Sequence, residues 1–325
     1  MTNVVNKQKN TEFLAYEEAF IHVKNEVERS LTKSPLLIRE YLSHLAFSQG
    51  KFIRTASLIT CAQDNDGNIH PNAIKVAAAI ELIHLSSLVH DDVMDNAEIR
   101  RGKVTLQKKY GQRTAVICGD YLLSIALKMI SNLSNKDDYM DMEITNDLGR
   151  LCLGELNQHI NNNNFNLSMY QYLKIISGKT ASLFELSFFA GAVISRCDEK
   201  IAKQYRQIGY YIGMIFQLSD DCIDFDSTVK EANKPVQSDF EQGVITLPLI
   251  HAFHVDHDFK DKVSNSGVNR QEINEVVSNT EGIKFTKIVI QKYYNKAVKR
   301  LNELELNESK KNQLMSILNQ AARVN

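Results

Sequence analysis

The stretch IKVAAAIELIHLSSLVHDDVMD, residues 74–95, decides the fold class of this chain. Its apolar residues recur at spacings of three and four, which is the period of an α-helix. A second stretch, KQYRQIGYYIGMIFQLSDDCIDFD at 203–226, repeats this spacing. Strict alternation of apolar and polar residues, the signal of a strand, is scarce along the chain. We therefore expect a helix from Pro71 to Asp95 and another long helix over the second stretch.

The composition agrees with an all-α fold. Only 4 prolines and 14 glycines interrupt 325 residues, of which 43% are hydrophobic, so helix breakers are rare and a large core can form. The sequence predicts one helical domain over residues 1–325, a bundle of long helices. Polar connections are expected at 63–72, 131–138, 161–168, 227–243 and 255–271.

Charge and cysteine usage narrow the class of protein. The 38 basic residues nearly balance the 39 acidic ones, which argues against a general nucleic-acid binder. The 5 cysteines have no metal-type spacing and favour reduced thiols in the cytoplasm. The N-terminal residues contain no secretory signal, and we expect no apolar run long enough to span a bilayer and hence no membrane anchor.

Two clusters of aspartates stand at the ends of the two predicted helices. Both follow the pattern D-D-x-x-D, and two such clusters are hard to attribute to a solvated helix end. Carboxylate oxygens suit Mg²⁺, which binds through one or two carboxylates plus substrate phosphates. The clusters consist of Asp91, Asp92 and Asp95, and of Asp220, Asp221 and Asp224.

Cationic residues that would suit a diphosphate lie in the expected loops. Arginine can contact phosphate with two nitrogens, whereas lysine acts as a point charge. The SGKT run at 177–180 lacks the upstream glycines of a P-loop. The candidates are Lys51, Arg54, Arg100, Arg101, Lys179 with Thr180, and Lys234.

These motifs together resemble the trans-type isoprenyl diphosphate synthases, over residues from about 45 to 250. Besides the two aspartate clusters, the resemblance rests on GK-x-x-R at 50–54, RRG at 100–102, GD at 119–120, GELNQ at 154–158, GKT at 178–180 and KP…D…G…TLP from 234 to 248. The stretch ELIHLSSLVHDDVMDNAEIRRGK is most similar to the large, catalytic subunit of the two-component hexaprenyl and heptaprenyl diphosphate synthases.

The resemblance implies the isoprenoid synthase fold, in which helices surround a deep central cavity. It implies that isopentenyl diphosphate is added to an allylic diphosphate, here farnesyl diphosphate, until a hexaprenyl or heptaprenyl chain for a quinone is complete. It further implies three Mg²⁺ ions in each site, a small partner subunit or a homodimer, and transient membrane contact on product release.

The resemblance also assigns roles to single residues. Asp91, Asp92, Asp95 and Asp220 match metal ligands, and Asp221 and Asp224 match groups that help through water or by supporting the ligands from behind. The residues that match allylic diphosphate contacts are Arg100, Lys179 and Lys234. Those that match the isopentenyl diphosphate pocket are Lys51, Arg54, His84 and Arg101, and those that match polar groups near the reacting carbons are Thr180 and Gln217.

The chain departs from the family pattern at two places. SQGKFIRT stands where the family has GGKRLRP. After the second aspartate cluster, Asn233 and Gln237 replace two glycines and Val244 replaces a phosphate-binding lysine. We expect the phosphate loop to close differently or to need another chain.

The helix before the first cluster suggests a product tunnel. Ser87, Ile83, Ile80 and Val76 follow one flank of the face that carries Asp91, and a growing prenyl chain could run along them. Ser86 occupies the position that matches the family's chain-length residue, and a small side chain there leaves the tunnel open. The alternative is that both serines only allow helices to pack closely.

Three functions remain open at this point. The first is a chain-elongating prenyltransferase; the second is a terpene cyclase or head-to-head synthase on the same fold. A cyclase would not need the full set of isopentenyl diphosphate cations. The third is a non-catalytic regulatory subunit, which would be expected to lose one aspartate cluster. The histidines at 251, 254 and 257 are interpreted as a solvated helix end and not as a metal site.

Overall fold

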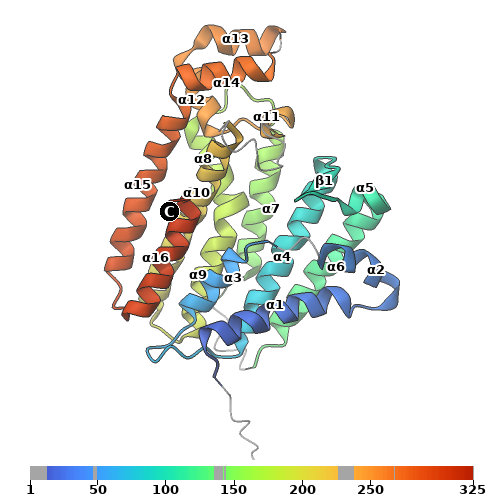
Figure 1. Ribbon diagram of the computed structural model, residues 1–325, viewed down its shortest axis with the longest axis vertical. Coiled ribbons are helices and arrows are strands. Elements are labelled where there is room, and N and C mark those ends of the chain that lie inside the picture. The colour runs from blue at the N-terminus through green and yellow to red at the C-terminus, as the bar shows by residue number, and fades with distance from the viewer. Residues whose placement is uncertain are drawn as a thin grey trace, which may run out of the picture.

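A computed structural model describes residues 13–46, 50–134, 142, 144–225, 238–266 and 268–324. Within these ranges the chain is mostly helical, and most of the long helices run along the long axis of the molecule, whereas α1 crosses it (Figure 1). The first half contains α1 (Tyr16–Thr32), α2 (Leu36–Ala46), α3 (Ile53–Cys61), α4 (Asn72–Met94), β1 (Ile99–Arg100), β2 (Lys103–Val104), α5 (Leu106–Tyr110), α6 (Gln112–Ser131) and α7 (Ile144–Ile160). The second half contains α8 (Met169–Ile176), the π-helix η2 (Ser177–Ala181), α9 (Ser182–Ile194), α10 (Glu199–Phe225), α11 (Ser238–Glu241), α12 (Leu247–Val255), α13 (His257–Ser266), α14 (Arg270–Asn279), α15 (Gly282–Asn302) and α16 (Glu308–Ala322).

The helix that the sequence predicts from Pro71 to Asp95 is present as α4. Pro71 is its N-cap and Asp95 its C-cap. The helix packs against α1, α3, α6 and α9, so nearly every side carries buried residues. A helix that is apolar all round is expected in the middle of a large bundle.

Helix α10 confirms the second predicted helix and packs against α9 and α15. It approaches its neighbours closely because it has glycines at the contacts. A Cβ at Gly213 would lie 2.6 Å from the Cα of Ala181, and one at Gly209 would lie 2.7 Å from the carbonyl oxygen of Phe184. Helices α4 and α10 end on the same side of the bundle, near β1 and α11 (Figure 1). The two aspartate clusters therefore share one end of the molecule.

The structure differs from the sequence prediction in some connections. Residues 255–271 were expected to be a break, but they hold α13 and the start of α14. The Asp256 side chain accepts a hydrogen bond from the Phe259 N–H at 2.8 Å and so caps α13, while Phe259 packs on Phe253. A short antiparallel hairpin, β1–β2, also interrupts the helical fold. Of the predicted loop at 227–243, only residues 238–243 lie within the described residues, and part of them forms α11.

Two helices in the described part of the chain, α4 and α6, are long and apolar enough to cross a membrane by length and composition alone. The expectation that no apolar run reaches this length was therefore wrong. The two helices pack against each other, and 56% of the most apolar window of α4 is buried against 28% for α6. A helix in the core of a bundle meets the same criterion as a membrane span, so this finding carries no further conclusion.

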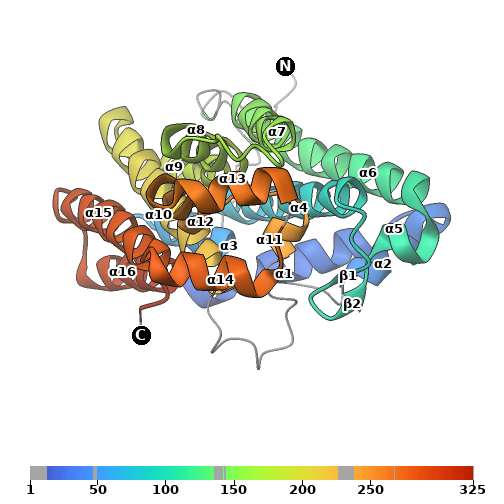
Figure 2. The same ribbon diagram turned by 90° about the horizontal axis from the view of Figure 1, so that it is seen from above.

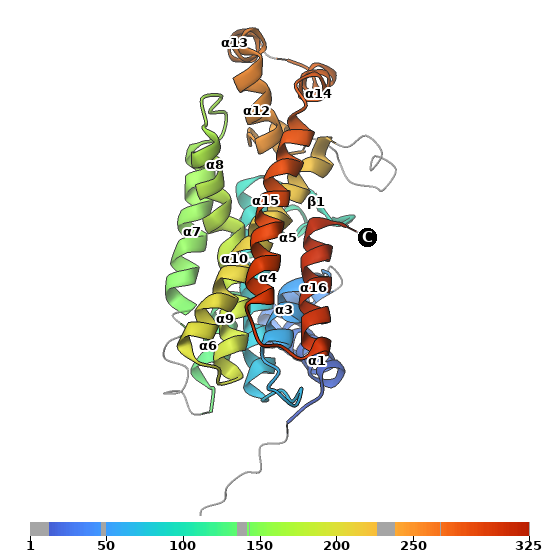
Figure 3. The same cartoon turned by 90° about the vertical axis from the view of Figure 1, so that its left-hand side faces the viewer.

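Two pairs of helices, α15 with α16 and α6 with α7, lie on the outside of the bundle (Figure 2). Helices α15 and α16 pack side by side, as Figure 3 shows, and α16 also contacts α3 and α10. Helices α6 and α7 lie on the same side of the molecule (Figure 2). Several large apolar side chains of these two helices are exposed, namely Val116, Ile117, Leu127, Leu153, Leu156 and Ile160.

Candidate active site

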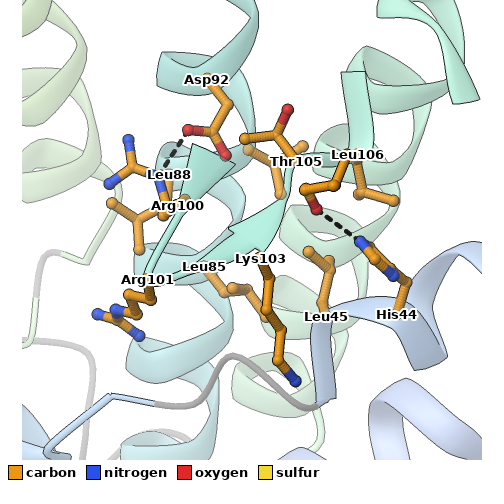
Figure 4. A pocket seen from close by; sticks show the side chains of 12 residues that line it. His44, Leu45, Leu85, Leu88, Asp92, Arg100, Arg101, Lys103, Thr105 and Leu106 are labelled. Atoms are coloured by element: carbon orange, nitrogen blue, oxygen red, sulfur yellow. Dashed lines mark hydrogen bonds and ion pairs between the residues drawn. The ribbon is translucent and has the colours of Figure 1, made fainter. Parts of the chain in front are cut away.

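A cavity of about 1760 Å³ opens between the ends of α4 and α10. Its wall combines residues from α3, α4, the β1–β2 hairpin, α7, η2, α10, α11 and α16. Carboxylates and cations line the part near the helix ends, whereas apolar side chains such as Leu151 and Phe216 line other parts. A smaller pocket lies next to the hairpin and contains Asp92 and Arg100 (Figure 4).

The first aspartate cluster stands at the C-terminal end of α4. Asp91 and Asp95 are one turn apart, and both line the large cavity, as their spacing predicts. Burial and the nearby Glu155 raise the pKa of Asp91 to about 7. Asp92 is buried on the hairpin side, where it accepts a hydrogen bond from Arg100 Nε at 2.6 Å (Figure 4). Burial raises the pKa of Asp92, and Arg100 opposes that rise.

The aspartates of the second cluster differ in exposure, since Asp220 is partly exposed and Asp221 is buried. Asp220 lines the cavity and forms an ion pair with Arg323, at the end of α16, with 2.6 Å between Oδ1 and Nη2. Asp221 is fully buried, and its two oxygens accept hydrogen bonds from Tyr172 and from Gln217. Burial raises the pKa of Asp221 well above its ordinary value, and these two hydrogen bonds act in the opposite direction. Asp221 therefore orients Tyr172 and Gln217, although it also belongs to the residues that line the cavity.

Asp239 is a further carboxylate of this site that the sequence analysis did not single out. It lies on α11 and lines the cavity. Burial raises its pKa to about 7, and the charges of Asp224, Asp220 and Asp95 add to that rise. Asp239 therefore lies near both clusters. The only sequence signal was its place in the run KP…D…G…TLP.

The donor set fits Mg²⁺ in its chemistry, because hard carboxylate oxygens surround a cavity in which burial disfavours their charge. Within the described ranges, however, no three of these groups are arranged as the ligands of one ion. The protein's own cations hold two of them, Arg100 on Asp92 and Arg323 on Asp220. Of the carboxylates that line the cavity, Asp91, Asp95, Asp220 and Asp239 are placed to hold a metal ion, whereas Asp221 is fully buried and held by Tyr172 and Gln217.

Lys179 and Thr180 project from the π-helix η2, a feature often found at functional sites. Lys179 Nζ lies 2.9 Å from Glu155 of α7, and both residues line the cavity. Thr180 donates to Gln217 Oε1 at 2.7 Å, and Gln217 donates to Asp221 at 3.0 Å. This chain of hydrogen bonds connects the π-helix to the second cluster.

The cations predicted to bind isopentenyl diphosphate meet in the same cavity. Lys51, Arg54, His84 and Arg101 all line it. The Arg54 guanidinium is buried 4.6 Å from the centre of the Phe184 ring, and burial lowers its pKa to about 10. The pKa of His84 is well below its ordinary value because of burial and the charges of Arg54 and Arg101. His84 is therefore a neutral hydrogen-bonding group at pH 7.

Other predicted residues have different outcomes. Lys234, Asn233 and Gln237 lie outside the described residues. Val244 does line the cavity, so the place of the family's lysine is uncharged. Asp224 lies close enough to Asp239 to raise its pKa. The histidines of 251–257 match the interpretation as a helix end, since His254 and His257 are exposed and His251 stacks on Phe285.

The predicted product tunnel agrees with the cavity only at its upper end. Ile83, Ser86 and Ser87 line the cavity, and Ser86 Oγ also donates to the Gly119 carbonyl at 2.8 Å. The structure places Val76 and Ile80 in the core between helices and not on the cavity wall. The wall beyond Ile83 instead uses residues of α6 and α7, including Leu123, Leu148 and Leu151.

Comparisons with known proteins agree with this geometry. The sequence model of the family described as "Polyprenyl synthetase" matches residues 35–280. "Heptaprenyl diphosphate synthase component 2" of Bacillus subtilis (strain 168) is 36% identical over 288 residues, covering 87% of this chain and 81% of that protein. "Octaprenyl diphosphate synthase" of Escherichia coli (strain K12) is 31% identical over 253 residues, covering 77% and 76%.

Solved structures extend the similarity to the whole fold. The crystal structure of heptaprenyl diphosphate synthase from Staphylococcus aureus is similar with a TM-score of 0.86 and 33% identity, covering 95% of this chain and 98% of that one. A polyprenyl synthase from Caulobacter crescentus CB15, complexed with calcium and isoprenyl diphosphate, has a TM-score of 0.83, 26% identity and coverage of 95% of both chains. The chain has the all-α isoprenoid synthase fold and belongs to the polyprenyl synthetase family, whose members are prenyltransferases.

Proposed function

We propose that this chain is a Mg²⁺-dependent prenyltransferase that adds isopentenyl diphosphate to an allylic diphosphate. Farnesyl diphosphate is the proposed first acceptor, and hexaprenyl or heptaprenyl diphosphate, a precursor of a quinone side chain, is the proposed product. The observation that carries the proposal is that one cavity contains carboxylates from both clusters, Lys179, and a separate group of cations around Arg54. The names of the similar heptaprenyl and octaprenyl synthases support a long product.

The proposed reaction needs charge stabilisation and a dry cavity. The allylic C–O bond breaks, and its electron pair leaves with the diphosphate. The double bond of isopentenyl diphosphate supplies the electron pair of the new C–C bond, and the adjacent carbon then loses a proton. Bound Mg²⁺ would neutralise the leaving diphosphate from the side of Asp91, Asp95 and Asp220.

The protein's own groups have distinct parts in this scheme. Lys179 and Arg100 hold the leaving diphosphate, where fixed positive charge stabilises the negative charge that develops. The oxygens of Thr180 and Gln217 lie beside the reacting carbons and suit the allylic cation electrostatically. The apolar wall excludes water, which would otherwise quench the cation.

The second group of cations favours chain elongation over cyclisation. Lys51, Arg54 and Arg101 line the cavity together with neutral His84. A cyclase has a single diphosphate to bind and does not need this second cationic pocket. The retention of both aspartate clusters likewise argues against a purely regulatory subunit.

A small partner subunit is part of the proposal. Two similar proteins carry the words "component 2" in their names. The exposed apolar side chains of α6 and α7 offer a surface for such a partner, with Ile117 62%, Leu153 66% and Ile160 69% exposed. Exposed apolar side chains that gather on a surface often mark protein–protein contacts. We also propose that residues 1–325 form one domain, that the protein is cytoplasmic and that it releases its product at a membrane surface.

The purified chain should be incubated with Mg²⁺, farnesyl diphosphate and labelled isopentenyl diphosphate, and the products sized after dephosphorylation. One sample contains the chain alone, and another adds an extract of source cells that lack this chain. Product only with extract supports the partner, whereas a long polyprenol in both samples refutes the need for one. An Asp220→Asn variant is the control for activity from the extract. Cyclic products, or no product in either sample, would contradict the proposed function.

A further inference from the structure

Glu81 is a carboxylate in the middle of a cationic pocket, where an anionic substrate would be repelled. It lies on α4, one turn before His84, and lines the cavity beside Arg54 and Arg101. A negative charge in this place needs a physical reason, and its contacts provide one.

Glu81 Oε1 accepts two hydrogen bonds from Thr55 of α3. The Thr55 N–H donates at 3.1 Å and the Thr55 Oγ1–H at 2.7 Å. Thr55 is completely buried, so neither donor can turn to water. The N–H groups in the first turn of a helix have no partner within the helix. The N-cap residue Phe52 supplies no side-chain hydrogen bond, so Glu81 of α4 caps α3 from outside.

The capped turn is the one that presents the cations. Arg54 directly precedes Thr55, and Lys51 directly precedes Phe52, whose φ of 52° turns the chain into the helix. Arg54 Nε is buried and has no hydrogen-bond partner among the described residues. Arg54 also lines the cavity, and a guanidinium at a cavity wall is suited to a phosphate oxygen.

The charge of Glu81 also balances the buried cations. Burial lowers the pKa of Arg54 to about 10, and Glu81 opposes this fall. Burial and Arg100 lower the pKa of Arg101, and Glu81 opposes that fall as well. Burial raises the pKa of Glu81 itself, while the Thr55 hydrogen bonds and Arg54 favour its charged form.

We propose that Glu81 is a positioning residue for the second diphosphate pocket, which caps α3 so that Lys51 and Arg54 are held toward isopentenyl diphosphate. The inference rests on the proposed function, because it takes the substrate of this pocket from there. It adds a residue that acts through Thr55 and does not itself touch the substrate. Loss of the cap frees the first turn of α3 and disorders both cations together.

The test compares Glu81→Ala with Glu81→Gln, in the full chain with whatever partner activity requires. The amide oxygen of glutamine can accept both Thr55 hydrogen bonds, whereas alanine can accept neither. We expect Glu81→Ala to raise the KM for isopentenyl diphosphate about tenfold, the ratio that corresponds to the loss of one good cap. The KM of Glu81→Ala for the allylic diphosphate should stay within about twofold of the unmodified value. Glu81→Gln should have a KM for isopentenyl diphosphate close to that of the unmodified chain.

Several outcomes decide the inference. Equal rises in both KM values, or a lower melting temperature with unchanged KM values, would show a purely structural role and overturn it. Glu28→Ala, at an exposed position on α1, is the control for charge removal. If Glu81→Ala does not fold, Thr55→Val removes one of the two hydrogen bonds and carries the test with Glu81→Gln.

A binding measurement separates this inference from the proposed function. Calorimetry with inorganic diphosphate in EDTA measures binding by the cations of the protein in the absence of metal. If the unmodified chain makes no prenyl product either alone or with the extract, the proposed function fails. Weaker diphosphate binding by Glu81→Ala than by Glu81→Gln would still support the cap. Equal binding by the two variants would refute it.

Discussion

Gly154 of α7 is the position where a single methyl group should disable the site. A Cβ at Gly154 would lie 2.2 Å from the Lys179 backbone nitrogen and 2.6 Å from the Gly178 carbonyl carbon. Both contacts are to backbone, so no flexible side chain can move aside. Ordinary contacts of a Cβ begin near 3.4 Å, so α7 and η2 must separate by about 1 Å. The displaced element carries Lys179, and Glu155, its ion-pair partner, follows Gly154.

The size of the effect follows from that displacement. Overpacking of this kind costs about 1–3 kcal/mol, which corresponds to a melting temperature lower by about 1.5–4.5 °C in a chain of this size. A misplacement of about 1 Å can reduce the rate about a hundredfold. We therefore expect Gly154→Ala to remain folded and to lose most of its kcat.

The chain offers a matched control on the same helix. Gly149 is exposed, and a Cβ there would meet nothing within 4 Å. Gly149→Ala should therefore keep full activity and gain about 0.5–1 kcal/mol of stability, because alanine favours the helix. Steady-state prenyltransfer and thermal unfolding of both variants make the comparison. Normal kcat in Gly154→Ala would refute the reasoning that η2 must touch α7 to place Lys179.

Three further predictions concern the metal, the pH and the product. Arg323→Ala should lower the Mg²⁺ concentration that gives half-maximal activity, because it frees Asp220; a higher requirement in a Mg²⁺ titration would contradict this. In EDTA, the raised pKa of Asp239, about 7, means that the folded chain binds more protons than the unfolded chain between about pH 4 and pH 7. The stability that protonated Asp239 contributes to the folded chain is therefore lost as the pH rises. Asp239→Asn should flatten the fall in melting temperature from pH 5 to pH 8, and an unchanged fall would contradict this prediction. Ser86→Phe should shorten the product on thin-layer chromatography, and an unchanged product length would refute the tunnel prediction.

The sequence predicted the long helices well because their signals are long and local. The helix expected from Pro71 to Asp95 became α4, Asn72–Met94, and its apolar residues alone specified a core element. The segment at 255–271 failed for the opposite reason. Its polar composition suggested a loop, but Asp256 caps a polar surface helix, and a few buried residues such as Val263 are enough to hold it.

The sequence predicted which residues line the site, but not which of them form hydrogen bonds with one another. Spacing predicted that Asp91 and Asp95 share one face, and the family motifs indicated Lys179 and Arg54, which line the same cavity. No local pattern indicates that Glu81 would cap α3 from another helix. Such contacts depend on how helices distant in sequence pack, and only the three-dimensional structure contains that information.

The ion pairs of the site suggest how its charges are used. Asp92 holds Arg100, Asp220 holds Arg323, and Glu155 holds Lys179. Each pair joins an acidic group with a cation of the kind that diphosphate binds. A diphosphate that arrived alone would leave the carboxylates without a counter-charge, and a metal ion that arrived alone would do the same to the cations. The Asp92–Arg100 and Glu155–Lys179 pairs are partly buried, and buried charges are costly when they lose a partner. If the chain has the proposed function, we therefore expect the internal pairs to favour the metal–diphosphate complex over either component.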